Sequence, residues 1–286
     1  MKKYKLTNET IEYKGKKLYR IKALIDFGNV KKGARGGFVE KEENLSMSGN
    51  AWVSGDAQVY GDALVCGGAQ VYGTAQVYGD ALVCGGAQVY GGAQVYGGAQ
   101  VYGGAQVYGT AQVCGGAQVY GGAQVYGGAQ VYGTAKVCGD AQVYGDALVC
   151  GAAQVCGTAK VCGDALVCGG AQVYGTAKVY GAAKVCGDAL VCGDAFVYGD
   201  AQVSGNALVD KSINYAVIKG FGTCYRPTTF FRCQDKTVKV SCGCFLGTID
   251  EFRNQVKNTR GGKIAKEYLM IADLMELHFS EDGYDD

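Results

Sequence analysis

The sequence predicts an all-β solenoid, a three-sided parallel β-helix of about nine coils, from three observations on its central part. Glycine is abundant, with 48 residues against a single proline, which indicates a repeat array and excludes collagen. Valine occupies every sixth position from Val53 to Val209, which makes 27 six-residue units, or hexads. Within each hexad small apolar and larger side chains alternate, as they do on a strand with one buried face.

A typical hexad begins at Ala57 and explains why the repeat closes on itself. Ala57 and Val59 point to one side of a short strand, and Gln58 and Tyr60 point to the other. Gly61 then turns the chain, because glycine adopts a positive φ without steric cost. A corner in every hexad closes most readily as a triangle, so three hexads, or 18 residues, make one coil. Valine and alanine then fill the interior, and each strand pairs with the strand one coil away.

Two resemblances to known proteins support this prediction. Val59, Ala63 and Val65 follow the pattern of the hexapeptide-repeat family, an aliphatic residue and then a small residue at the fifth position. This resemblance implies a left-handed β-helix, whereas the periodicity by itself also allows a right-handed triangle of the bactofilin type. The stretch from Ile21 into the repeat resembles the entry segment of YdcK-like hexapeptide-repeat proteins of bacteria and their phages. The residues that carry this second resemblance are Ile21, Ala23, Leu24, Asp26, Phe27, Gly28, Gly33, Gly36, Gly37, Phe38, Val39, Glu40, Asn44 and Leu45.

The net charge changes sign at the ends of the repeat, which divides the chain into three parts. Residues 1–46 carry 12 basic and 6 acidic side chains, a net +6. Residues 47–210 carry 4 basic and 10 acidic side chains, a net −6, and residues 211–286 carry 11 and 10, a net +1. We interpret these parts as an N-terminal β-hairpin capping segment, the hexapeptide-repeat β-helix and a small α+β domain. Caps are expected, because an open solenoid exposes unpaired strand edges.

The N-terminal segment is expected to contain a hairpin that turns at Lys14-Gly15. The basic stretch 31–37, KKGARGG, lacks the strand–loop–helix context of a phosphate-binding P-loop and is interpreted as a solvated turn.

The C-terminal domain is expected to contain three strands followed by two helices. The strands cover residues 214–221, 228–234 and 237–242, and the last two form a hairpin that turns at Asp235-Lys236. Thr248 and Glu251 form a capping box that opens a helix through about Lys257. A second, amphipathic helix is expected over residues 264–278. Its apolar positions include Tyr268, Ile271, Ala272, Leu274 and Met275.

Stacking at 18-residue intervals sorts the outward side chains into three columns. One column contains a candidate aromatic face for binding, made of Tyr72, Tyr90, Tyr108, Tyr126 and Tyr144. The favoured interpretation is that such ladders stabilise the rod itself, and the alternative is a flat surface that binds a partner. Cysteines stack as well: Cys66 and Cys84 are expected about 4.8 Å apart, within disulfide range. Because the sequence shows no export signal, we expect a cytoplasmic protein with free thiols.

Four cysteines of the C-terminal domain are weak candidates for zinc ligands: Cys224, Cys233, Cys242 and Cys244. Paired C-x-x-C knuckles are absent from the sequence, so no metal and no cofactor are expected. Cys242 and Cys244, at alternate strand positions, are expected to point the same way into a core.

These features favour a non-enzymatic scaffold or binding protein, a rigid rod whose C-terminal domain binds a protein partner or forms a homo-oligomer. The hexapeptide-repeat resemblance implies an alternative, acyl transfer from acetyl-CoA. The enzymes of that family use a histidine base near a loop that interrupts the coils. This chain has one histidine, His278, and no loop interrupts its 27 hexads.

Other classes fit less well. A phage protein that mimics DNA or binds a host factor is a further alternative, but a mimic of this length needs about 25 negative charges. The rod carries ten aspartates offset by four lysines. Nucleic-acid binding is therefore not expected, and ice binding is disfavoured because tyrosine, glutamine and cysteine do not form a threonine lattice. No apolar run reaches the ~18 residues of a membrane span.

Overall fold

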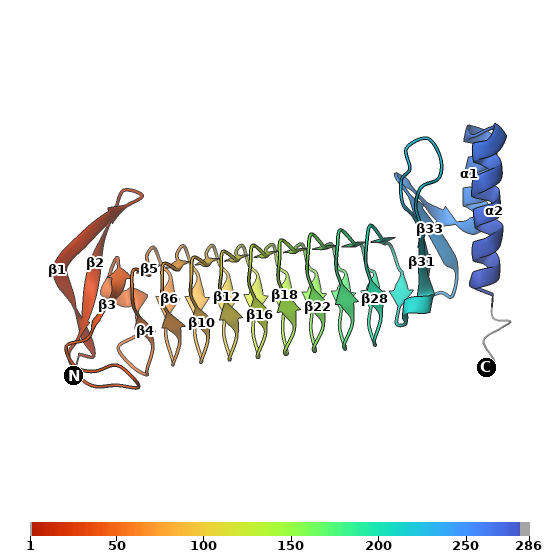
Figure 1. Ribbon diagram of the computed structural model, residues 1–286. Helices are drawn as coiled ribbons and strands as arrows, with labels where there is room; N and C mark the ends of the chain where they lie inside the picture. Colours follow the sequence, from red (N-terminus) through yellow and green to blue (C-terminus); the bar gives the residue numbers. More distant parts are fainter. Residues whose placement is uncertain (1, 281–286) are drawn as a thin grey trace.

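The computed structural model describes residues 2–280 and shows a long three-sided β-solenoid with a small module at each end (Figure 1). Within the described residues the repeat forms 27 two-residue strands, one in every hexad, from β4 (Trp52–Val53) to β30 (Leu208–Val209). These strands lie in three parallel sheets with nine repeat strands in each, as far as the structure describes the chain. The predicted solenoid of nine regular coils is therefore confirmed.

The strands pair at the predicted interval of 18 residues. Strand β10 (Gln88–Val89) lies between β7 (Gln70–Val71) and β13 (Gln106–Val107) with valine opposite valine in register. The Tyr90 amide donates a hydrogen bond of 3.0 Å to the Val107 carbonyl oxygen of the next coil. The backbone groups of each strand are thus satisfied along the rod axis, which lets so short a strand persist.

Valine and alanine fill the interior of the rod. Each hexad's inward alanine and valine, from Ala57 to Val209, is at most 1% exposed. Removal of a valine side chain from water contributes about 1.5–3 kcal/mol, so this uniform core is the main stabilising feature of the solenoid.

The corners depend on one glycine per hexad. The first corner glycine has φ between 61° and 74° in every hexad from Gly49 to Gly205. Gly61, at φ 70°, confirms the predicted turn. The coils stack so closely that a Cβ on Gly61 would lie 3.1 Å from the Gly79 amide nitrogen. Glycine is therefore required here both for backbone conformation and for space.

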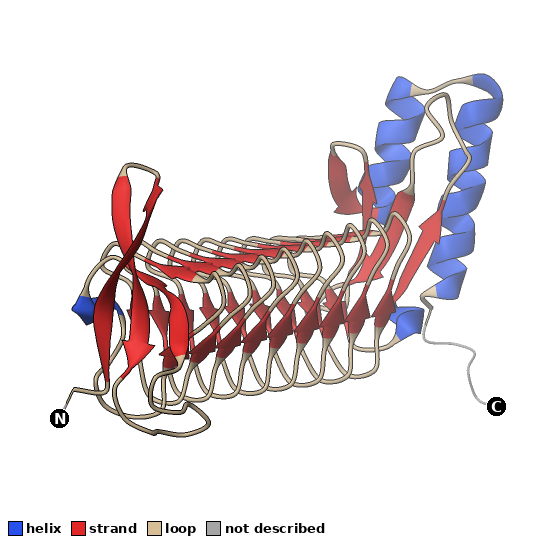
Figure 2. Cartoon of the chain, turned by 60° about the vertical axis from the view of Figure 1, so that its left-hand side comes forward, coloured by secondary structure: helices blue, strands red, loops and turns tan. Residues whose placement is uncertain are grey.

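The N-terminal cap is a hairpin joined to one side of the solenoid (Figure 2). Strands β1 (Tyr4–Tyr13) and β2 (Lys16–Ala23) pair antiparallel. The turn lies at Lys14 and Gly15, both at positive φ, as predicted. Strand β3 (Arg35–Val39) then pairs antiparallel with β2 and parallel with β5 (Gln58–Val59), so it connects the cap with the solenoid. The basic turn before β3 leads into a strand and not into a helix, which excludes a P-loop.

A short 3₁₀ helix, η1 (Glu42–Asn44), completes the N-terminal coil. The buried Asn44 side chain donates hydrogen bonds to the carbonyl oxygens of Gly61 at 3.0 Å and Ala63 at 2.8 Å. Leu45 forms a parallel bridge with Val65. The segment therefore covers the strand edges of the first regular coil.

The C-terminal domain is a four-stranded antiparallel sheet with two helices. Its elements are η2 (Ser212–Asn214), β31 (Tyr215–Ile218), β32 (Thr228–Arg232), β33 (Val238–Cys242), β34 (Phe245–Thr248), α1 (Ile249–Thr259) and α2 (Gly262–His278). The three predicted strands are confirmed, and β34 is an additional one that the sequence reading missed. The two helices lie side by side at the far end of the rod (Figure 1).

Both predicted helices are confirmed in position. The Thr248 side chain accepts a hydrogen bond of 3.2 Å from the Glu251 amide, and Glu251 accepts one of 2.8 Å from the Thr248 amide. The buried residues of α2 are Tyr268, Ile271, Ala272 and Met275. The prediction that Leu274 belongs to the same face was wrong: Leu274 is 55% exposed, because α2 contacts the domain on one side only.

Among the described residues, no helix combines the length and the hydropathy that a membrane span requires.

Candidate functional site

The candidate aromatic face is a continuous ladder of stacked rings. Tyr72, Tyr90, Tyr108, Tyr126 and Tyr144 follow one another with ring centroids 4.8–4.9 Å apart and interplanar angles of 2–3°. The spacing equals the distance between paired strands, so the backbone register imposes the stack. Each ring covers its neighbours, and this geometry supports the interpretation that the ladder stabilises the rod.

Burial and neighbouring groups make the ladder phenols harder to ionise. A hydrogen bond with the Cys162 thiol, and then burial, raises the pKa of Tyr144 to about 12. Burial, followed by the charges of the adjacent phenols, raises the pKa of Tyr108.

These raised values predict a loss of stability at high pH. The folded pKa lies above the unfolded value of about 10, so the folded state retains protons that the unfolded chain releases. The contribution is complete below about pH 10 and decreases as the pH rises toward about 12. Urea midpoints measured from about pH 9 to about pH 11 are expected to fall. A variant with phenylalanine at all five positions retains the stack without titrating, so its midpoint should fall less; an equal fall would contradict the prediction.

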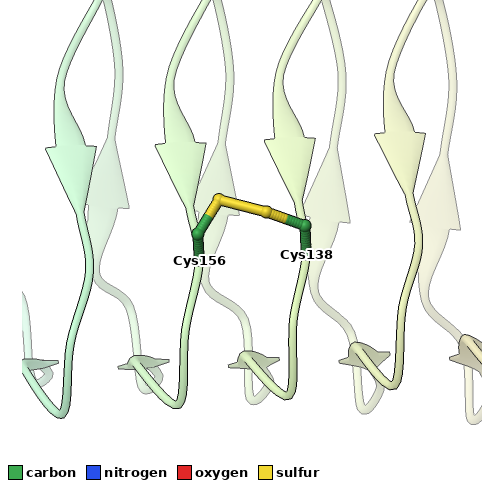
Figure 3. The surroundings of a disulfide bond; sticks show 2 residues. All are labelled: Cys138 and Cys156. Atoms are coloured by element: carbon green, nitrogen blue, oxygen red, sulfur yellow. A yellow bond between two sulfur atoms is a disulfide. The ribbon is translucent and has the colours of Figure 1, made fainter.

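Stacked cysteines occupy the same columns as the tyrosines. Cys138 and Cys156 are bonded as a disulfide between neighbouring coils, with Cα atoms 4.7 Å apart (Figure 3). The distance confirms the expected stacking, but the expectation that all the thiols are free was wrong for this pair. The in-register strands hold the two side chains within bonding distance without any change of the backbone.

A pocket lies in the C-terminal domain between the sheet and the helices. Its volume is about 310 Å³. Phe245, Phe252 and Tyr268 form its apolar lining, and Phe252 packs edge-on against Tyr268 at 5.8 Å. Gly222 lets the loop between β31 and β32 approach, because a Cβ there would overlap the Tyr268 hydroxyl.

Two arginines give this pocket a positive rim. Arg226 comes from the loop before β32, Arg260 follows the end of α1, and both side chains are exposed. Neither has a carboxylate within 4.0 Å among residues 2–280. Two cations beside an apolar floor suit a ligand that carries a carboxylate next to an apolar group. The sequence reading missed this site, because its residues are close only in the folded domain.

The structure does not bring the four C-terminal cysteines together. Cys224, Cys242 and Cys244 line the pocket, whereas Cys233 is buried against the end of the solenoid core. Within the described part of the chain, no group of three or more histidine, cysteine, aspartate or glutamate side chains is arranged to hold a metal ion. The expectation that Cys242 and Cys244 point into one core was wrong. Gly243 and Cys244 form the turn between β33 and β34, which leaves Cys244 exposed.

The single histidine lies at the end of α2. The His278 ring packs edge-on against Phe279 at 4.9 Å. It is not among the residues that line the pocket. On the same helix Met270, Leu274 and Leu277 form an exposed apolar stripe. Their spacing of four and three residues was visible in the sequence, but sequence alone did not show which face of α2 contacts the domain.

Comparison with protein families matches the repeat to the YdcK β-solenoid repeat, over residues 57–73, 75–91 and 141–157. No curated protein matches the chain significantly.

Proposed function

Because the chain is a YdcK β-solenoid repeat protein, we propose that it is a non-enzymatic binding protein in which the solenoid is a rigid spacer and the C-terminal domain recognises a partner. The observation that carries the proposal is the C-terminal pocket, where two unpaired arginines flank an apolar floor. The solenoid, by contrast, presents regular columns of side chains.

The rod is suited to hold its two ends at a constant distance. Its coils are joined by hydrogen bonds in every strand, and its core is uniformly buried. Nine coils at strand spacing span about 43 Å. A spacer of this kind separates the N-terminal cap from the C-terminal domain without a flexible hinge.

The proposed partner is a protein segment that places a carboxylate between Arg226 and Arg260 and an apolar side chain against Phe245 and Phe252. Guanidinium groups bind carboxylates through paired hydrogen bonds, and both arginines are free to do so in the described structure. The cavity of about 310 Å³ accommodates one or two side chains of such a segment.

The proposal is tested with the full chain immobilised in a bacterial lysate and compared with Arg226→Ala/Arg260→Ala. The matched control is Lys160→Ala/Lys178→Ala, which removes the same charge from the solenoid. We expect a retained protein to bind the unmodified chain and the control saturably, and the pocket variant at least about tenfold more weakly, as the loss of one charged hydrogen-bonding pair implies. No retained protein, or retention that is indifferent to the pocket arginines, would overturn the proposal.

The acyltransferase alternative has a separate test. Titration calorimetry of the full chain with acetyl-CoA is expected to give no binding heat, since the only histidine is outside the pocket and packs against Phe279. Saturable binding, followed by a slower acetyl transfer in His278→Ala, would favour the enzyme instead.

A further inference from the structure

Ten of the chain's 14 cysteines lie in the solenoid, each directly after the inward valine of its hexad. They are Cys66, Cys84, Cys114, Cys138, Cys150, Cys156, Cys162, Cys168, Cys186 and Cys192. Because the columns repeat every 18 residues, two of these cysteines become neighbours only at that separation. This condition selects Cys66 with Cys84, Cys138 with Cys156, and the run Cys150, Cys168 and Cys186.

The backbone holds these neighbours in register. Strands β6 (Leu64–Val65) and β9 (Leu82–Val83) pair directly before Cys66 and Cys84. Strands β23 (Leu166–Val167) and β26 (Lys184–Val185) do the same before Cys168 and Cys186, whose sulfur atoms lie 2.6 Å apart.

One of these pairs is already bonded. Cys138 and Cys156 join neighbouring coils with Cα atoms 4.7 Å apart (Figure 3). The other pairs have the same position in the repeat, and their side chains are half-buried, so a small oxidant in solvent reaches them.

We propose that the cysteine columns are oxidisable staples, in which a low-molecular-weight disulfide such as oxidised glutathione links neighbouring coils. Three staples form in a fully oxidised rod: Cys66–Cys84, Cys138–Cys156 and one bond within the column of Cys150, Cys168 and Cys186. Cys114, Cys162 and Cys192 remain free, because residues other than cysteine stand above and below them in their columns.

Each staple forms in two exchange steps. A cysteine thiolate attacks oxidised glutathione, forms a mixed disulfide and releases one glutathione thiolate. The neighbouring cysteine then loses its proton, attacks the mixed disulfide and releases the second glutathione. Two protein thiols are oxidised, one glutathione disulfide is reduced, and the two protons end on the two glutathione thiols.

The column of three cysteines allows exchange as well. Burial, and then the hydrogen bond from Cys168, raises the pKa of Cys186 to about 12, so Cys186 is a poor first nucleophile. The first attack therefore falls to Cys168 or Cys150. Once Cys168–Cys186 has formed, Cys150 lies next to Cys168 in the same column and can displace Cys186. One bond and one free thiol remain at any time.

The physical consequence is resistance to separation and slippage of the coils. The hexads are nearly identical, so a shift of one coil leaves the interior unchanged and few side chains oppose it. A covalent bond between coils removes that freedom. It also closes a short loop in the unfolded chain, which lowers the entropy of unfolding.

The test compares fully reduced full-length protein with the same protein equilibrated with oxidised glutathione. Free thiols are then alkylated, and peptides are mapped by mass spectrometry without reduction. Chymotrypsin cleaves after the tyrosines between members of two pairs, and trypsin cleaves at Lys160 between Cys150 and Cys168. We expect linked peptides only at 18-residue separation, and a rise of the Tm of about 5 °C or more.

A matched pair of variants separates stapling from general oxidation. Cys66→Ser/Cys138→Ser/Cys168→Ser removes one member of each pair, and it leaves Cys150 and Cys186 about 9.5 Å apart, beyond the reach of a disulfide. Cys114→Ser/Cys162→Ser/Cys192→Ser removes three unpaired cysteines. The first variant should lose the linked peptides and the Tm shift, and the second should retain both. Stable glutathione adducts in place of linked peptides in the unmodified chain, or links that involve Cys114 or Cys162, would overturn the proposal.

Discussion

Deletion of residues 1–46 is expected to produce heterogeneous and aggregating rods. The N-terminal segment covers the open strand edges of the first coil, with the Phe38 and Glu40 amides bonded to the carbonyl oxygens of Ala57 and Val59. Without these partners the edges are free to pair with other chains. The loss also removes the only irregular coil at this end, which sets the register of the near-identical hexads that follow.

Size-exclusion chromatography with light scattering measures the result. A chain that begins at Met47 should elute as a broad distribution of high mass, whereas a single sharp species with unchanged circular dichroism would contradict the prediction.

A point substitution tests the same contacts without removing the cap. Asn44→Ala removes the hydrogen bonds to Gly61 and Ala63 and leaves two buried carbonyl groups unsatisfied. We expect a loss of about 1–3 kcal/mol in the free energy of unfolding. Glu43→Ala is the control, since Glu43 is exposed on the same 3₁₀ helix. Equal effects of the two substitutions would show that the cap contacts do not matter.

Gly103→Ala is expected to destabilise the rod far more than Gly104→Ala, although the two glycines are adjacent in one corner. Gly103 has φ 70°, and a Cβ there would lie 3.0 Å from the Gly121 amide nitrogen. An alanine in the left-handed region costs about 1–3 kcal/mol before any steric overlap between stacked corners is relieved.

Gly104 is the matched control within the same turn. A Cβ on Gly104 would lie 3.4 Å from the Gly121 carbonyl oxygen, an ordinary contact. Alanine already occupies the equivalent position at Ala152 and Ala182. Gly104→Ala should therefore be neutral, or stabilising by about 0.4–1 kcal/mol through the unfolded state. Urea midpoints of the two variants measure the difference, and similar midpoints would be inconsistent with a conformational requirement at Gly103.

Some of the site could be predicted from the sequence and some could not. The tyrosine ladder and the stacked cysteines followed from the period, because strands that pair at 18-residue intervals place equivalent side chains one strand spacing apart. The C-terminal pocket did not follow. Arg226 and Arg260 are separated by 34 positions, and no periodic signal relates them. Only the packing of α1 on the sheet brings them to one rim.

The sequence by itself determined the solenoid: its strands, its 18-residue coil, its valine and alanine core and its corner glycines. A six-residue period leaves one way to bury every valine and pair every backbone group. The tertiary structure decided the ends. The extra strand β34, the exposure of Leu274 and the separation of Cys233 from Cys244 depend on which faces contact one another. Those contacts join residues of no common period, so the local pattern does not encode them.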